Sequence, residues 1–156
     1  MAQEMKIANC ENKQIKLITF HKEYTVDSKI IKISDFIKEF IKKYGYLEPI
    51  QVFNIDDNIL EKVIDFCNYY INIGPYQKIP KPLHTNNMNE LVNPFYAHLV
   101  DIPHIQLLML IEAANFLDIA PLLELVCAKI GTIIKDKSTQ ELRDFFNITN
   151  DLTQEE

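Results

Sequence analysis

The sequence predicts an α/β fold: a small mixed sheet of three or four strands with helices around it, followed by two or three appended helices. Short apolar runs with strand-like alternation lie in the first third of the chain, and runs with helical spacing fill much of the rest. The chain has 156 residues, of which 47% are hydrophobic, so it can form one domain with a substantial core.

Three short strands are expected near the N-terminus. The run from Ile15 to Phe20 alternates in polarity, and Tyr24 to Val26 follows after a short polar break, which is typical of a hairpin. Ile50, Val52 and Phe53 predict a third strand.

Helix start and stop signals follow the predicted strands. Ser34 can cap a helix whose apolar residues recur at helical spacing, and Gly45 suits its C-terminal end. Asp56 or Asp57 can cap a second helix, which Gly74-Pro75 ends.

The middle of the chain changes from irregular to helical. Residues 76–93 are rich in Pro and Asn, so we expect a mobile surface loop with no part in an interface, with a fourth short strand as a further option. Ile105 to Leu117 is apolar on nearly all sides, which indicates a buried helix. Asp118 marks the start of another helix, in whose first turn Pro121 is tolerated.

Two capping boxes mark the C-terminal part. Ser138-Thr139-Gln140-Glu141 predicts a helix that carries Phe145 and Phe146, which either pack in the core or form the wall of a groove for a partner helix. The second box, Thr153-Gln154-Glu155-Glu156, announces a helix where the sequence stops. We therefore expect that a terminal helix has been removed, with a chance occurrence of this short pattern as the alternative.

Charge and motifs argue against several classes of function. The chain has 22 acidic and 16 basic residues, a formal net charge of −6, whereas nucleic acids and anionic membranes attract basic surfaces. No apolar run approaches the length of a membrane span. The four histidines lack the spacing of a zinc site, and no nucleophile or phosphate-binding motif occurs. We expect no cofactor, no metal site and no enzymatic activity.

The cysteines favour a reducing compartment. Cys10, Cys67 and Cys127 are odd in number and far apart, so they suggest no disulfide framework. Cys67 and Cys127 lie in apolar runs, where we expect them to be reduced packing residues.

Two segments carry a resemblance to a known family. Ala113-Ala114-Asn115-Phe116-Leu117-Asp118-Ile119 resembles a segment of the Skp adaptors and of elongin C, both of which have the BTB/POZ fold. The tail from Phe146 to Glu156 is similar to the Skp tail, whereas elongin C stops before it. The resemblance covers about residues 13–156. It departs from the family in a short, Asn-rich loop instead of an acidic insertion, in Thr139 where some protist members carry a hydroxylated Pro, and in the missing terminal helix.

The resemblance implies a BTB/POZ-like cullin-binding domain over residues 13–135 and an F-box-binding helical tail over residues 136–156. It implies a non-catalytic adaptor that links F-box substrate receptors to a cullin scaffold in an SCF-type ubiquitin ligase. Asn115 and Phe116 match the family's cullin-binding Asn-Tyr pair, although Phe116 lacks the Tyr hydroxyl. The matching F-box-binding positions, for at least half of which core packing is the alternative role, are Leu123, Cys127, Ile130, Ile134, Leu142, Phe146, Ile148 and Leu152.

The expected partners are therefore a cullin and F-box proteins, with a homodimer when the F-box protein is absent. We expect the cytoplasm and the nucleus as locations. The alternative functions are a self-association module of the BTB type and an elongin-C-like adaptor.

Overall fold

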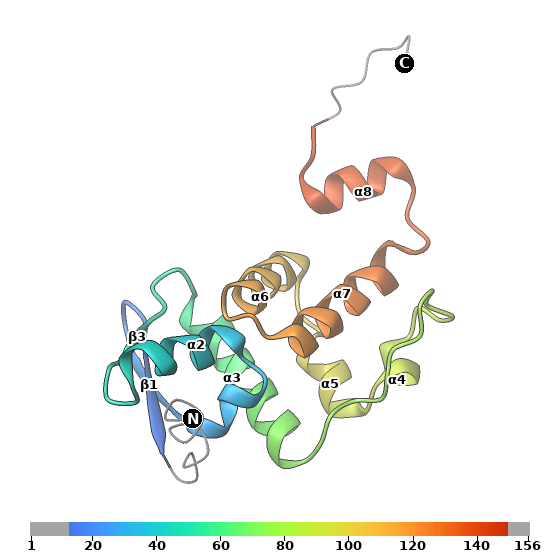
Figure 1. The fold of residues 1–156 in the computed structure, drawn as a ribbon. Coiled ribbons are helices and arrows are strands. Elements are labelled where there is room, and N and C mark those ends of the chain that lie inside the picture. The colour runs from blue at the N-terminus through green and yellow to red at the C-terminus, as the bar shows by residue number, and fades with distance from the viewer. Residues whose placement is uncertain (1–12, 150–156) are drawn as a thin grey trace.

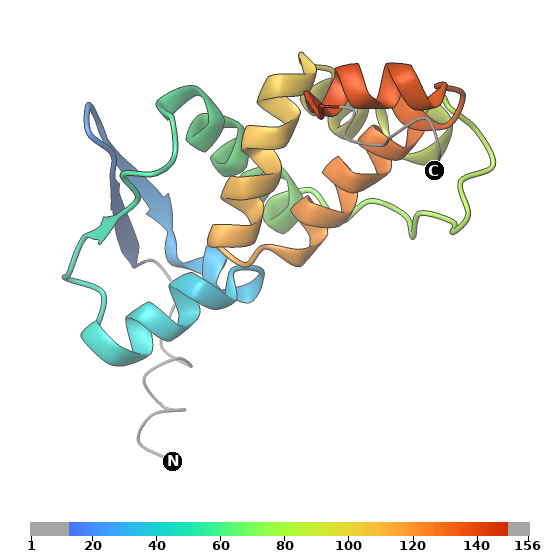
Figure 2. The same cartoon turned by 90° about the horizontal axis from the view of Figure 1, so that it is seen from above.

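The computed structural model describes residues 13–149. Three strands and the helices around them follow one another in this part of the chain (Figure 1), in the order β1 Gln14–Ile18, β2 Glu23–Asp27, η1 Ser28–Lys32, α2 Asp35–Tyr44, β3 Ile50–Gln51, α3 Asp57–Asn72, α4 Met88–Leu91, α5 Pro94–Leu99, α6 His104–Phe116, α7 Ala120–Ile134 and α8 Thr139–Phe146. Figures 1 and 2 both place the sheet and α8 at opposite ends of the molecule.

The sheet is mixed, as predicted. Its strand order is β2-β1-β3, with β1 antiparallel to β2 and parallel to β3. Ile15 and Leu17 on β1 are buried while Lys16 between them is exposed, so the alternation that predicted the strand also points its apolar side chains into the core. The predicted α/β class with appended helices is confirmed, as are the hairpin and the third strand.

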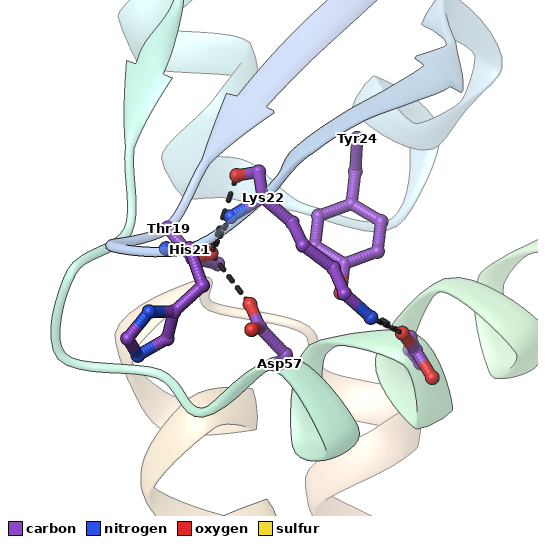
Figure 3. A network of polar contacts seen from close by, with 6 residues as sticks. Thr19, His21, Lys22, Tyr24 and Asp57 are labelled. Carbon is purple, nitrogen blue, oxygen red and sulfur yellow. Dashed lines mark hydrogen bonds and ion pairs between the residues drawn. The ribbon is translucent and has the colours of Figure 1, made fainter.

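A polar network holds the tip of the hairpin on the first turns of α3 (Figure 3). The Thr19 hydroxyl donates to the Asp57 carboxylate, and the Lys22 backbone N–H donates to Thr19 Oγ1 over 3.0 Å. The Tyr24 hydroxyl and Lys22 Nζ both donate to Glu61 Oε1, at 2.9 and 3.2 Å. Hydrogen bonds from Tyr24 and Lys22 lower the pKa of the Glu61 carboxyl below its ordinary value.

Ser34 caps α2 and also joins α2 to the end of α6. Its hydroxyl accepts from the Ile37 N–H over 3.3 Å and donates to the Leu117 carbonyl over 2.6 Å, in a fully buried position. The Asp35 N–H donates to the Asp118 carbonyl over 3.2 Å. The N-terminus of α2 is therefore fixed against the turn between α6 and α7. At the other end Gly45 has a φ of +87°, as its predicted role in ending the helix requires.

The prediction of a surface loop over residues 76–93 is wrong for several of its residues. Ile79, Met88, Leu91 and Val92 are buried in the core, and α4 lies within the segment. The optional fourth strand does not form, since the part of the chain that the structure describes holds three strands. The Asn and Pro residues that suggested a loop serve as helix starts: Asn87 and Asn93 cap α4 and α5, and Pro94 opens α5.

The helix predicted over residues 105–117 exists as α6, but it is only partly buried. Leu107 and Leu110 are fully buried, whereas Ile105 is 61% exposed. α6 packs against α3 and α7, and Glu112 and Asn115 on it are exposed as well. Cys127 also departs from expectation, since it is exposed on α7, while Cys67 is buried as predicted.

The last described helix starts where the sequence indicated, whereas α7 has Ile119 as its N-cap and not the predicted Asp118, which lies in the turn before it with a φ of +50°. α7 begins after Ile119, with Pro121 in its first turn. α8 begins with the complete capping box, in which the Ser138 side chain bonds the Glu141 N–H and the Glu141 carboxylate bonds the Ser138 N–H. The second capping box, at residues 153–156, lies outside the described residues.

Candidate functional site

The predicted cullin-binding pair lies at the C-terminal end of α6. Asn115 is exposed, and Phe116 is half-buried. The Phe116 ring packs on the half-buried Phe36 ring of α2, with the ring centroids 4.9 Å apart. The Asn115 side chain is therefore accessible to solvent, while one part of the Phe116 ring packs on Phe36 and the other part is exposed.

The backbone around this pair is held firmly. Leu117 and Ile119 are fully buried on either side of Asp118, which has a φ of +50°. The Leu117 carbonyl accepts the Ser34 hydroxyl described above, and the Ile119 N–H donates to the Ala114 carbonyl over 2.9 Å. These bonds and buried side chains fix the backbone of the turn that follows Asn115 and Phe116.

The predicted F-box residues on α7 follow one side of the helix at the spacing i, i+4, i+7, i+11. Their exposure differs along this line. Leu123 and Ile134 are half-buried and Cys127 is exposed, whereas Ile130 is 8% exposed and belongs to the core. The structure therefore brings Leu123 and Cys127 to the surface together, and it leaves Ile130 mainly a packing role.

The predicted F-box residues on and after α8 are more open. No residue of α8 is buried, Phe146 is 36% exposed and Ile148 is 59% exposed. Leu142 is half-buried, and Leu152 lies outside the described residues. Phe145 is half-buried and its ring lies on His104, with the ring centroids 5.1 Å apart, whereas Phe146 is at the surface.

A groove that sequence reasoning missed lies beside the exposed part of α7. Residues 79–83 form one side, and Leu123 and Cys127 are on the α7 side. The groove has a volume of about 660 Å³. One sequence feature could have indicated it: Gly131 stands inside a helix, where Gly is costly and often marks a close approach by another segment.

Two further properties of the described part bear on its chemistry. Within residues 13–149, no group of three or more His, Cys, Asp and Glu side chains is arranged to hold a metal ion, and no helix has the length and apolarity of a membrane span. Burial raises the pKa of the Cys67 thiol to about 12, so this sulfur stays protonated at neutral pH.

Comparisons with known families match most of the chain. The description "Skp1 family, tetramerisation domain" fits residues 13–72, and "Skp1 family, dimerisation domain" fits residues 120–156. The second match includes the tail whose pattern favours the Skp adaptors over elongin C.

Relatives that match over most of their length also place the chain in the Skp1 family. The chain is 42% identical over 145 residues to "S-phase kinase-associated protein 1 homolog" of Tetrahymena thermophila, covering 92% of this chain and 87% of the relative. It is 33% identical over 140 residues to "SCF ubiquitin ligase complex protein SKP1a" of Dictyostelium discoideum, covering 86% and 83%. It is 32% identical over 149 residues to "Suppressor of kinetochore protein 1" of Schizosaccharomyces pombe, covering 92% and 90%. The resemblance seen in the sequence is thereby confirmed, and the chain belongs to the Skp1 family.

Proposed function

We propose that the chain is a non-catalytic adaptor that joins an F-box substrate receptor to a cullin scaffold in an SCF-type ubiquitin ligase. Relatives named as SCF ubiquitin ligase complex proteins support this role. The structural observation that carries it is the apolar surface along α7 and α8, where Leu123, Cys127, Phe146 and Ile148 remain accessible.

The adaptor has two binding surfaces on different elements. The F-box surface follows α7 and continues to α8, which lies far from the sheet in both views (Figures 1 and 2). The cullin surface is the fixed turn after α6, where Asn115 and Phe116 lie beside α2. Separate surfaces allow both partners to bind at once.

The adaptor acts through geometry. The adaptor holds the substrate receptor and the scaffold in one assembly. The substrate and the ubiquitin-transfer machinery are then close together, which raises their effective concentration. The chain itself needs only to bind both partners and to remain rigid between them. The cytoplasm and the nucleus are the proposed locations, in keeping with the reduced cysteines.

The test uses three purified components. An F-box domain selected for binding to the Tetrahymena relative and the N-terminal part of a cullin are mixed with the chain and separated by size-exclusion chromatography. A complex of all three is expected, whereas the F-box domain and the cullin part alone should elute separately. If the chain binds neither protein at micromolar concentration, the proposal is wrong.

A second function, self-association, is favoured by a specific observation. Phe146 and Ile148 are exposed on the tail, and the family description for residues 120–156 is that of a dimerisation domain. We propose that free chains pair through this surface when no F-box protein covers it. Sedimentation equilibrium over a range of concentrations tests this: the mass should rise towards that of a dimer, and the F-box domain should return it to one copy of each protein.

A further inference from the structure

The segment over residues 76–86 lies along α7 for most of the length of that helix. At one end the Tyr76 hydroxyl contacts the Pro121 carbonyl at 2.7 Å and the Glu124 carboxylate at 3.0 Å. At the other end Asn86 Nδ2 donates to the Asp136 carboxylate over 3.2 Å. Burial and the bond to Glu124 raise the pKa of Tyr76, so its hydroxyl remains a donor. The contacts at both ends give the segment a defined course over the helix.

Leu83 is the apolar contact in the middle of this course. A Cβ atom at position 131 would lie 2.8 Å from Leu83 Cδ1, so the missing side chain of Gly131 leaves the space that Leu83 fills. Lys135 Nζ also donates to the Leu83 carbonyl over 3.4 Å. Gly131 lowers the stability of the helix relative to Ala, but it allows the segment to approach α7 closely.

The segment and α7 together form the groove described above. Ile79, Pro82 and Leu83 line it from the segment, and Leu123 and Cys127 line it from α7. At its edge Lys81 Nζ lies 3.6 Å from the Glu124 carboxylate in an exposed ion pair. An apolar groove with residues spaced i, i+4 on one wall and a polar edge is suited to the apolar face of an amphipathic helix.

We propose that residues 79–83 form the second wall of the F-box groove and help to select which F-box helix binds. The inference rests on the proposed function, and the groove is continuous with the F-box surface because Leu123 and Cys127 belong to both. The segment lies outside both family matches, which cover residues 13–72 and 120–156.

The experiment compares substitutions at the wall with a matched change elsewhere. Leu83→Glu places a charge against Gly131 and the groove, and Leu83→Ala removes the contact without adding a charge. Leu47→Glu and Leu47→Ala are the controls, because Leu47 is 96% exposed in the connection between α2 and β3. The probe is the same recombinant F-box domain, with the dissociation constant measured by calorimetry and cullin binding measured in parallel.

Leu83→Glu should weaken F-box binding by about tenfold, which is the loss expected for one apolar contact in a binding groove. Leu83→Ala should weaken it less, and both Leu47 variants should bind normally. Cullin affinity should stay unchanged in all four, which also shows that the variants fold. If Leu83→Glu loses cullin binding as well, this variant is misfolded, and the F-box affinity of Leu83→Ala is then used to test the proposal. In hydrogen exchange, the amides of residues 77–86 should exchange more slowly once the F-box domain is bound.

Unchanged F-box affinity in both Leu83 variants would overturn the proposal. So would tighter binding, because it would mean that the segment competes with the F-box helix for the face of α7. Failure of the unaltered chain to bind the F-box domain would instead refute the proposed function, and the inference with it. Measurement of F-box binding by the unaltered chain distinguishes failure of the proposed function from failure of the inference.

Discussion

The end of α6 allows cullin binding to be separated from folding by two single substitutions. Asn115 is exposed, so Asn115→Lys should change the free energy of unfolding by less than about 0.5 kcal/mol. A new charge at the centre of an interface should weaken cullin binding by about 2 kcal/mol, or roughly thirtyfold. The exposed Asn68 on α3 is the matched control, and Asn68→Lys should leave the cullin affinity unchanged.

Phe116→Lys should behave differently because the ring packs on Phe36. Loss of the aromatic pair costs about 1 kcal/mol, and exposure of a half-buried ring costs about another 1 kcal/mol. The sum of about 2 kcal/mol corresponds to a fall in melting temperature of roughly 4–8 °C. Phe116→Tyr should retain both the fold and cullin binding.

Thermal melting by circular dichroism and cullin affinity by biolayer interferometry measure the two effects. Asn115→Lys should bind the cullin poorly and melt at the same temperature as the unaltered chain. Cullin binding by Asn115→Lys as tight as that of the unaltered chain would contradict this prediction, since the exposed end of α6 would then lie outside the interface.

Three further predictions concern other parts of the chain. Iodoacetamide should label the exposed Cys127 and spare the buried Cys67, as measured by peptide mass spectrometry. The F-box domain should protect Cys127 from labelling. Equal labelling of Cys127 with and without the F-box domain would count against F-box binding at the α7 surface. Because the pKa of Glu61 is lowered in the folded chain, its contribution to stability is present above the unfolded-state pKa and is lost as the pH falls through the folded-state pKa. Glu61→Gln should therefore flatten the fall in melting temperature below about pH 4.5. An unchanged dependence of the melting temperature on acid pH would contradict this. Ser138→Ala removes one bond of the capping box and should destabilise α8 by about 1 kcal/mol, seen as faster amide exchange there but not in α3.

Local rules explain the elements that the sequence predicted well. Ser34 and Ser138 each cap a helix through their own hydroxyl, and Gly45 takes a positive φ after α2. The alternation around Ile15 and Leu17 is likewise local. Each of these signals lies within a few residues of the structure that it specifies, so no knowledge of the tertiary fold is needed to read it.

The features that were missed depend on contacts between distant parts of the chain. Leu83 meets Gly131 only when the segment over residues 76–86 lies along α7, so its Pro-rich and Asn-rich composition suggested a loop instead. On α7 the helical spacing places Cys127 and Ile130 in the same set, but their burial depends on which neighbours pack on each side. The family resemblance suggested these residues as an F-box surface, whereas the exposure of each residue required the structure.

The most direct test of the account is the mass of the complex formed when both partners are present. Sedimentation velocity of the chain with a saturating F-box domain, followed by the addition of the N-terminal part of the cullin, measures this mass at each step. The account predicts one complex with a single copy of each of the three proteins, lost on Asn115→Lys with the F-box complex retained. Displacement of the F-box domain by the cullin would contradict it, because the two surfaces would then not act as separate sites on one adaptor.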